Sequence, residues 1–187
     1  MLGSYQHVTE LPVRTSFLYP FAAFLALAVP LEAQFSFSDR SDLLTNSSSS
    51  GAPMAIVDLN GDGRDDLIRI HQTDRLLIDY QNAPGQGFSA YDYGDLPRGS
   101  IWAVCAADVD RNGLNDIFLG PSSGGALLLK AGTSAQSYSL VELPDRDIFV
   151  QGSIFADFDN DGNIDLFACD DNDDNHPYKN DGAGGFS

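Results

Sequence analysis

An aspartate-rich segment of nine residues occurs three times in the chain at almost constant spacing. The copies span residues 58–66 (loop 1), 108–116 (loop 2) and 157–165 (loop 3), so their starts are 50 and 49 residues apart. Each copy has oxygen-bearing side chains at positions 1, 3, 5 and 9 and a glycine at position 6. Self-similarity with a period of this length is typical of repeat architectures, so each loop is expected to belong to one structural unit.

A second marker recurs in step with the loops and supports the same period. An aromatic residue followed by serine occurs four times, with gaps of 51, 50 and 48 residues: Phe37-Ser38, Phe88-Ser89, Tyr138-Ser139 and Phe186-Ser187. Two independent markers with one period indicate a true repeat of about 50 residues.

The residues between the markers are typical of short β-strands. Runs of three to six apolar or alternating residues, bounded by Gly, Asp, Asn and Pro, predict strands at 54–57, 67–70, 75–80, 101–105, 117–119, 126–129, 153–156 and 166–168. No segment after residue 33 combines helical periodicity with capping residues. The sequence therefore predicts an all-β fold with four-stranded antiparallel propeller blades. Residues 34–187 supply about three blades. A closed ring needs about four to eight, so we expect a fragment of a larger, seven-bladed propeller.

The three loops have the ligand pattern of a calcium site. Calcium takes six to eight oxygen ligands, and alternate side chains of a tight loop converge on one point. Glycine at position 6 permits the sharp bend because it tolerates a positive φ. At position 7 the side chain varies, so only the backbone carbonyl is expected to bind. The predicted ligands of about three calcium ions are Asp58, Asn60, Asp62, Arg64 and Asp66 in loop 1, Asp108, Asp110, Asn112, Leu114 and Asp116 in loop 2, and Asp157, Asp159, Asp161, Asn163 and Asp165 in loop 3.

The loops differ in charge and therefore in their expected dependence on the ion. Loops 1 and 2 offer three carboxylates and one asparagine each, whereas loop 3 offers four carboxylates. Clustered carboxylates repel one another without a cation, so loop 3 is expected to gain most from calcium. At position 8, Asp65 and Asn115 are expected to face solvent.

Two other kinds of loop share part of this pattern. A hairpin turn with Asp-Gly or Asn-Gly needs no ion, but it requires only two such residues, not oxygen ligands at four positions in three copies. An EF-hand requires a glutamate at position 12 and helices on both sides. Position 12 is Arg69, Leu119 or Ala168, each in a strand-like run, which excludes an EF-hand.

Three further features each allow two interpretations. The acidic run of residues 170–175 could add a surface cation site, but it is more typical of a solvated loop. Trp102 lies in a predicted strand before loop 2, where it could be a core residue or a platform on which a ligand stacks. Cys105 and Cys169 could form a disulfide in an exported protein or remain two separate thiols.

The N-terminal residues resemble a secretory signal. Residues 17–29 form an apolar run of 13 residues after Arg14, and Leu31-Glu32-Ala33 is a possible cleavage site. The run is shorter than the roughly 20 residues that span a bilayer, and it matches the apolar region of a signal peptide. We therefore predict a signal peptide at 1–33 and a secreted or cell-surface protein. A buried helix or an uncleaved anchor is the alternative.

The charge balance narrows the class of partner. The chain has 27 acidic and 10 basic residues, a net charge of −17. Such a balance argues against binding nucleic-acid phosphates and against an anionic membrane surface, and no membrane insertion is expected after the signal is removed. Ten of the acidic residues are predicted loop ligands.

The loop pattern, together with the segments 82–88 and 180–186 of the form Asn-x-x-x-x-Gly-Phe, resembles the FG-GAP/VCBS repeat of integrin alpha chains and many secreted bacterial proteins. The resemblance extends over residues 35–187. It implies that each loop binds calcium within a propeller blade, and that the propeller serves adhesion or ligand binding.

We accordingly expect a calcium-binding propeller module that binds an extracellular protein or carbohydrate, with calcium in a structural role. No paired catalytic residues are evident outside the loops, and no nucleophile elbow, phosphate loop or zinc motif occurs. An enzyme is therefore disfavoured. The alternatives are the propeller part of an exported polysaccharide-degrading enzyme and a purely architectural repeat of a larger surface protein.

Overall fold

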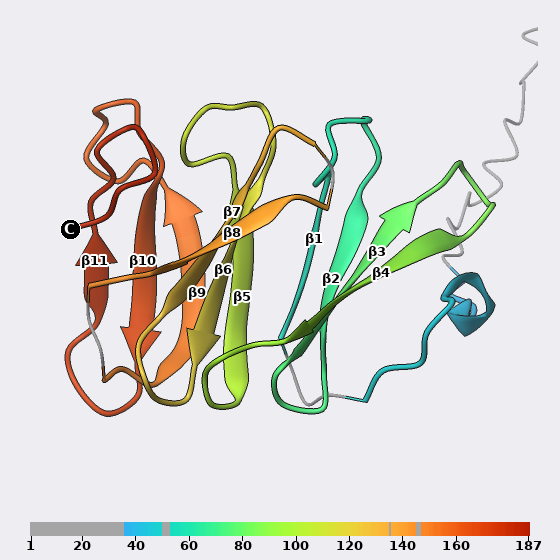
Figure 1. The fold of residues 1–187 in the computed structure, drawn as a ribbon, viewed down its shortest axis with the longest axis horizontal. Helices are drawn as coiled ribbons and strands as arrows, with labels where there is room; N and C mark the ends of the chain where they lie inside the picture. The colour runs from blue at the N-terminus through green and yellow to red at the C-terminus, as the bar shows by residue number, and fades with distance from the viewer. Residues whose placement is uncertain (1–35, 50–52, 135, 145–146) are drawn as a thin grey trace, which may run out of the picture. The chain divides into compact units, whose positions relative to one another are not determined.

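The computed structural model describes residues 36–49, 53–134, 136–144 and 147–187 (Figure 1). The chain divides into two units, Met1–Ser38 and Asp39–Ser187, and the second unit contains all the strands named below. The predicted signal peptide at 1–33 lies outside the described residues. Within the described ranges, no helix is long and apolar enough to cross a membrane.

The second unit consists of three antiparallel sheets in chain order. The first sheet contains β1 (Met54–Val57), β2 (Asp66–His71), β3 (Arg75–Gln81) and β4 (Phe88–Asp95). The second contains β5 (Ile101–Ala107), β6 (Asp116–Pro121), β7 (Leu127–Ala131) and β8 (Tyr138–Glu142). The third contains β9 (Val150–Ala156), β10 (Asp165–Asp170) and β11 (His176–Tyr178). The 3₁₀ helix η1 (Ser41–Leu43) precedes them.

Each sheet is a meander in which consecutive strands pair, as expected for a propeller blade. This arrangement confirms the predicted all-β class with about three blade-like sheets. The aromatic-serine marker begins the fourth strand of the first and second sheets, at Phe88 and Tyr138. In the third sheet, which has three named strands, Phe186 forms an isolated bridge with Asn180.

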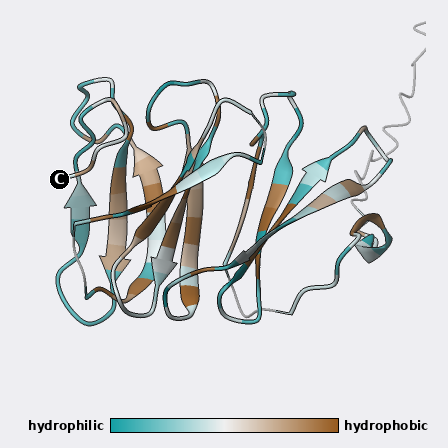
Figure 2. Cartoon of the chain, in the orientation of Figure 1, coloured by the Kyte–Doolittle hydropathy of each residue, from teal (hydrophilic) through white to brown (hydrophobic). Residues whose placement is uncertain are grey.

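Two hydrophobic clusters lie between neighbouring sheets. In β6, Ile117 and Leu119 pack with residues of the first sheet, whereas Phe118 packs with residues of the third. Alternate residues of a strand point to opposite faces, so β6 in the second sheet is buried on both sides. Hydrophobic residues accordingly gather along the strands and hydrophilic residues along the loops (Figure 2). Burial of each such large side chain contributes about 1.5–3 kcal/mol.

Candidate metal sites

Each of the three loops connects the first and second strands of its sheet, and all three lie at the same end of the sheets, at the top of Figure 1. Position 9 is in every copy the first residue of the second strand: Asp66, Asp116 or Asp165. Position 12 lies inside that strand, so the exclusion of an EF-hand is confirmed. The hairpin geometry brings the first and last carboxylates of each loop close together.

The carboxylate at position 1 organises the loop backbone. In each copy it accepts a hydrogen bond from the glycine N–H at position 6, with O···N distances of 2.7 Å in loop 1 and 2.9 Å in loops 2 and 3. Those glycines have φ values of 80°, 88° and 88°. This region is open to glycine at little cost, which explains why position 6 is Gly63, Gly113 or Gly162.

Position 4 also adopts a positive φ, a requirement that was not predicted. Gly61, Arg111 and Asn160 have φ values of 74°, 58° and 61°. Glycine and asparagine are the residues that adopt this conformation most easily, so their presence in two of the three copies was the available signal. Arg111 is the exception, and its side chain makes a contact described below.

The carboxylate at position 9 is fully buried in all three copies. One oxygen accepts the backbone N–H of the residue 15 positions later, at 2.8 Å from Gln81, 2.7 Å from Ala131 and 2.9 Å from Asn180. This bond ties loops 1 and 2 to the last residue of the third strand, and loop 3 to a residue just beyond it. It is a structural role that the sequence pattern did not reveal.

The second oxygen of this carboxylate distinguishes the loops. In loops 1 and 2 it accepts the N–H of position 2, from Leu59 at 2.9 Å and from Val109 at 3.0 Å. In loop 3 the Asp165 Oδ2 atom is buried and has no hydrogen-bond partner among the described residues. An unpaired buried carboxylate oxygen is costly, and a cation is the ligand that would satisfy it.

Burial also affects the ionisation of these carboxyl groups. It raises the pKa of Asp116 to about 6, although the N–H groups of Val109 and Ala131 act in the opposite direction. Burial likewise raises the pKa of Asp66. For the less buried Asp58, the pKa-raising effect of burial is outweighed by backbone N–H donors, Gly63 first, so its pKa is lowered. A nearby divalent cation would favour the ionised form of each.

In loops 2 and 3, three carboxylates converge closely enough to share one ion. One oxygen each from Asp108, Asp110 and Asp116 lies within 4.8 Å of the others, and the same holds for Asp157, Asp159 and Asp165. In loop 1, no such group of three occurs among the described residues, because position 3 is Asn60 and Asp62 pairs with Arg64 at 2.5 Å.

The remaining predicted ligands at positions 5 and 7 are held by local contacts. Asn112 accepts the N–H of Leu114 at 2.8 Å and donates to the Ala131 carbonyl at 2.9 Å. Asp161 accepts the N–H of Asn163 at 2.8 Å. Ligation by the position 7 carbonyls of Arg64, Leu114 and Asn163 stays a prediction.

Adjacent loops contact one another directly. Arg111 in loop 2 donates to the Gly162 carbonyl and, at 2.8 Å, to Asn163 Oδ1 in loop 3. Asn115 donates to the Asp58 carbonyl of loop 1 at 2.7 Å. The prediction that Asn115 faces solvent was therefore wrong, because its amide is used between loops, whereas Asp65 is exposed as expected.

Two lysines form ion pairs with predicted ligands, and neither was identified from the sequence. Lys130 Nζ is 3.1 Å from Asp110 Oδ2 in loop 2. Lys179 Nζ pairs with Asp159 and is 3.0 Å from Asp161 Oδ2 in loop 3. The two lysines are 49 residues apart, the same offset as loops 2 and 3, and this coincidence was the signal that could have identified them.

The remaining candidate features lie away from the loops. Residues 171–175 of the acidic run are exposed, as expected for a solvated loop, and no group of three carboxylates converges there among the described residues. Cys105 and Cys169 are both free thiols.

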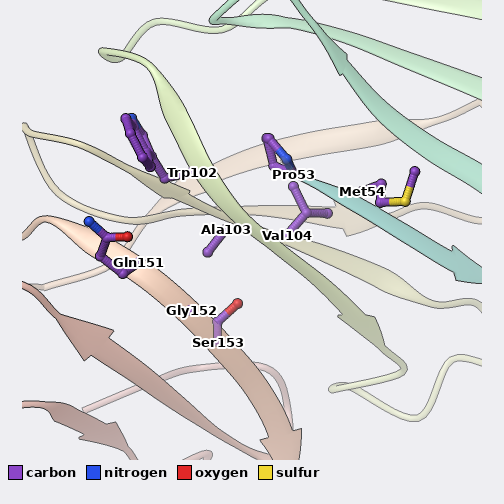
Figure 3. Close-up of a pocket in the computed structure, with 8 residues that line it drawn as sticks. All are labelled: Pro53, Met54, Trp102, Ala103, Val104, Gln151, Gly152 and Ser153. Atoms are coloured by element: carbon purple, nitrogen blue, oxygen red, sulfur yellow. The ribbon is translucent and has the colours of Figure 1, made fainter. Parts of the chain in front are cut away.

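Trp102 is not a core residue, since 44% of its surface is exposed. Its ring packs edge to face with that of Phe149, with 5.4 Å between ring centroids. It borders a pocket of about 290 Å³ at the first strands of the three sheets (Figure 3). The described lining residues carry no charge; they are Pro53, Met54, Trp102, Ala103, Val104, Gln151, Gly152 and Ser153.

Comparison with known protein families matches residues 58–119 to the FG-GAP-like repeat. The matched segment runs from the start of loop 1 to position 12 of loop 2 and so includes both aspartate-rich segments with their intervening strands. It confirms the resemblance drawn from the loop pattern. A comparison with curated proteins gave no match.

Proposed function

From the FG-GAP-like repeat at residues 58–119, we propose that the chain is a secreted or cell-surface calcium-binding module of the β-propeller type. Calcium has a structural role in this proposal, because each loop joins the first two strands of a sheet and its carboxylates are the predicted ligands of the ion. The observation that carries the proposal is Asp165. Its Oδ2 is buried and has no hydrogen-bond partner among the described residues, and an oxygen of the same carboxylate lies in a cluster with Asp157 and Asp159, where a cation would satisfy it.

The chemistry of the loops fits a hard divalent cation. Every predicted ligand is an oxygen, from carboxylate, amide or backbone carbonyl, and these are the ligands of calcium and magnesium. Calcium tolerates six to eight ligands in irregular geometry, whereas magnesium requires a near-ideal octahedron and keeps several waters. A site with five predicted protein ligands in a short loop therefore favours calcium.

Ion binding would stabilise the loops by mass action. A ligand that binds only the folded state adds about 2.7 kcal/mol to stability at 100 times its dissociation constant. The ion would also neutralise carboxylates that repel one another, four of them in loop 3. The expected consequence is a stiffer end of the sheets, where the three loops lie.

Thermal unfolding of the full chain with calcium and with chelator tests this proposal. We expect calcium to raise the melting temperature, and magnesium at equal concentration to raise it less. Asp165→Asn should reduce the calcium-dependent shift, whereas the control Asp173→Asn, in the exposed acidic run, should leave it unchanged. Superimposable curves for the wild-type chain with and without calcium would contradict the structural-metal role.

For the partner, the pocket beside Trp102 favours a neutral carbohydrate over a protein. The apolar face of a sugar ring stacks on an exposed aromatic ring, and its hydroxyl groups need polar partners such as the Gln151 amide. The described lining includes no carboxylic acid, so the pocket lacks the pair of acids that glycoside hydrolysis uses. This composition supports binding without turnover.

Binding to an array of neutral glycans tests this part of the proposal. Trp102→Ala should abolish binding. Phe158→Ala is the matched control, because Phe158 is an equally exposed aromatic residue (45%) outside the pocket, and it should retain binding. Equal losses in both variants, or binding of no glycan by the wild-type chain, would overturn the carbohydrate assignment and favour a protein partner.

A further inference from the structure

A lysine from outside loop 3 places a positive charge on its predicted ligands. Lys179 directly follows β11, and its ammonium contacts Asp159 and Asp161, the predicted ligands at positions 3 and 5. The next residue, Asn180, donates its backbone N–H to the position 9 carboxylate of Asp165 at 2.9 Å. The same short segment therefore anchors one predicted ligand and places a positive charge on two others.

Loop 2 has the same arrangement, but its lysine is held more firmly. Lys130 lies on Asp110 at 3.1 Å, and Ala131 donates its N–H to Asp116 at 2.7 Å. Lys130 is additionally fixed by a 2.8 Å bond to the Ala183 carbonyl and has 22% of its side chain exposed. The Lys179 side chain is 54% exposed, so it can move into solvent more easily.

Loop 1 differs from the other two loops. The residue in the equivalent place is Tyr80, whose hydroxyl group contacts that of Tyr138 at 3.1 Å. The positive charge on a predicted ligand of loop 1 comes instead from Arg64, inside the loop, which pairs with Asp62. A lysine on the ligands is thus a property of loops 2 and 3, the two loops whose carboxylates converge.

We propose that Lys179 is an internal counter-cation of loop 3 that occupies the ligand carboxylates until calcium displaces it, and that Lys130 has the same role in loop 2. The inference rests on the proposed calcium function. An ammonium group neutralises one charge and binds carboxylate oxygens that the ion requires, so calcium must break these pairs before it binds. The lysine therefore lowers calcium affinity and stabilises the ion-free loop.

Loop 3 is the site at which this competition is best defined. The buried Asp165 Oδ2 has no partner among the described residues even with Lys179 in place. The ammonium therefore compensates the outer ligands, Asp159 and Asp161, and leaves the inner one for an ion. Because about half of the Lys179 side chain is already exposed to solvent, its displacement costs little, and it adjusts the affinity without preventing binding.

Calcium titration of the full chain by calorimetry tests the inference. Exposed ion pairs are individually weak, so loss of two pairs in Lys179→Met should tighten calcium binding at one site by about 2- to 30-fold, which corresponds to about 0.4–2 kcal/mol. The control is Arg75→Met. Arg75 also pairs with two exposed carboxylates, Asp92 and Asp95, at 2.7 Å each, but lies outside the loops. The two variants change net charge equally.

The outcomes separate this inference from the proposal beneath it. Tighter binding in Lys179→Met but not in Arg75→Met supports the counter-cation role. Equal affinities in these two variants, with calcium bound by the wild-type chain, overturn the inference alone. No calcium binding by the wild-type chain overturns the proposed function as well. If Lys179→Met does not fold, Lys179→Gln removes the same charge with a polar side chain, and the same comparison applies.

Discussion

Loops 2 and 3 have the same sequence pattern, yet the structure supports them differently. Both oxygens of Asp116 accept backbone N–H groups, from Val109 and Ala131, whereas Asp165 has only the N–H of Asn180 among the described residues. The position 2 residue accounts for the difference. Val109 is 1% exposed in the cluster between the second and third sheets, and Phe158 is 45% exposed. Loop 2 is thus fixed by packing, whereas loop 3 is left to depend more on an ion.

The largest expected effect is on the rate of thiol alkylation. It distinguishes the face of the second sheet that the third sheet covers, where Cys105 lies, from the equivalent face of the third sheet. Burial raises the pKa of Cys105 to about 12, so at pH 8 its thiolate fraction is about 1,000-fold below that of a free cysteine. In a Cys169→Ser background, alkylation by iodoacetamide should be slower by that factor and rise about tenfold per pH unit.

A matched variant places a thiol on the uncovered face. Ile154 is the residue equivalent to Cys105 in the third sheet, and it is 61% exposed. Ile154→Cys, combined with Cys105→Ser and Cys169→Ser, should react at the rate of a free thiol. Similar rates for the two positions would show that the faces do not differ in cover.

The next effect concerns the position 9 carboxylates. Without calcium, Asp116→Ala leaves two backbone N–H groups without an acceptor, and each buried unsatisfied donor costs about 1–3 kcal/mol. Asp165→Ala leaves only the N–H of Asn180 without an acceptor and removes an oxygen that has no partner among the described residues. The loss of stability should therefore be less than half of that for Asp116→Ala. Urea unfolding in chelator measures both changes. A larger loss for Asp165→Ala under these conditions would reverse the proposed order of support.

Packing at position 2 should give a smaller difference. Val109→Ala removes two buried methyl groups and should destabilise the fold by about 2 kcal/mol, at roughly 0.8 kcal/mol per group plus a cavity cost. Phe158→Ala acts at an exposed position and should change stability by no more than about 0.5 kcal/mol. The free energy of unfolding distinguishes them, and equal losses would indicate that Phe158 is covered in solution.

The smallest expected effect is at the contact between the two loops. Arg111→Ala removes the bonds from loop 2 to Gly162 and Asn163, and at this exposed site the loss should be about 1 kcal/mol or less. Amide hydrogen exchange should accelerate in loop 3 but not in loop 1. Arg111→Lys keeps the positive charge but not the several N–H donors of the guanidinium group, so its exchange rate in loop 3 should lie between those of the wild-type chain and Arg111→Ala. Unchanged exchange in loop 3 would mean that the contact does not restrain it.

Much of the fold followed from local pattern. The strand runs, the antiparallel meanders and the loop positions were predictable because each depends on residues near in sequence. Gly63, Gly113 and Gly162 were assigned to the bend and have the positive φ that it requires. Three aspartates in each of loops 2 and 3, at positions 1, 3 and 9, converge as the spacing predicted. Calcium occupancy and the partner remain predictions of the sequence, for which the experiments above provide the test.

The sequence by itself determined a repeated β-sheet unit with an oxygen-rich loop between its first two strands. Only the tertiary structure decided how each loop is held: that Asn115 reaches the neighbouring loop, that Lys130 and Lys179 lie on acidic ligands, and that Phe158 is exposed where Val109 is buried. The physical reason is distance along the chain. Turn geometry is set within nine residues, whereas burial and ion pairing at these positions depend on side chains that arrive from another strand or another sheet.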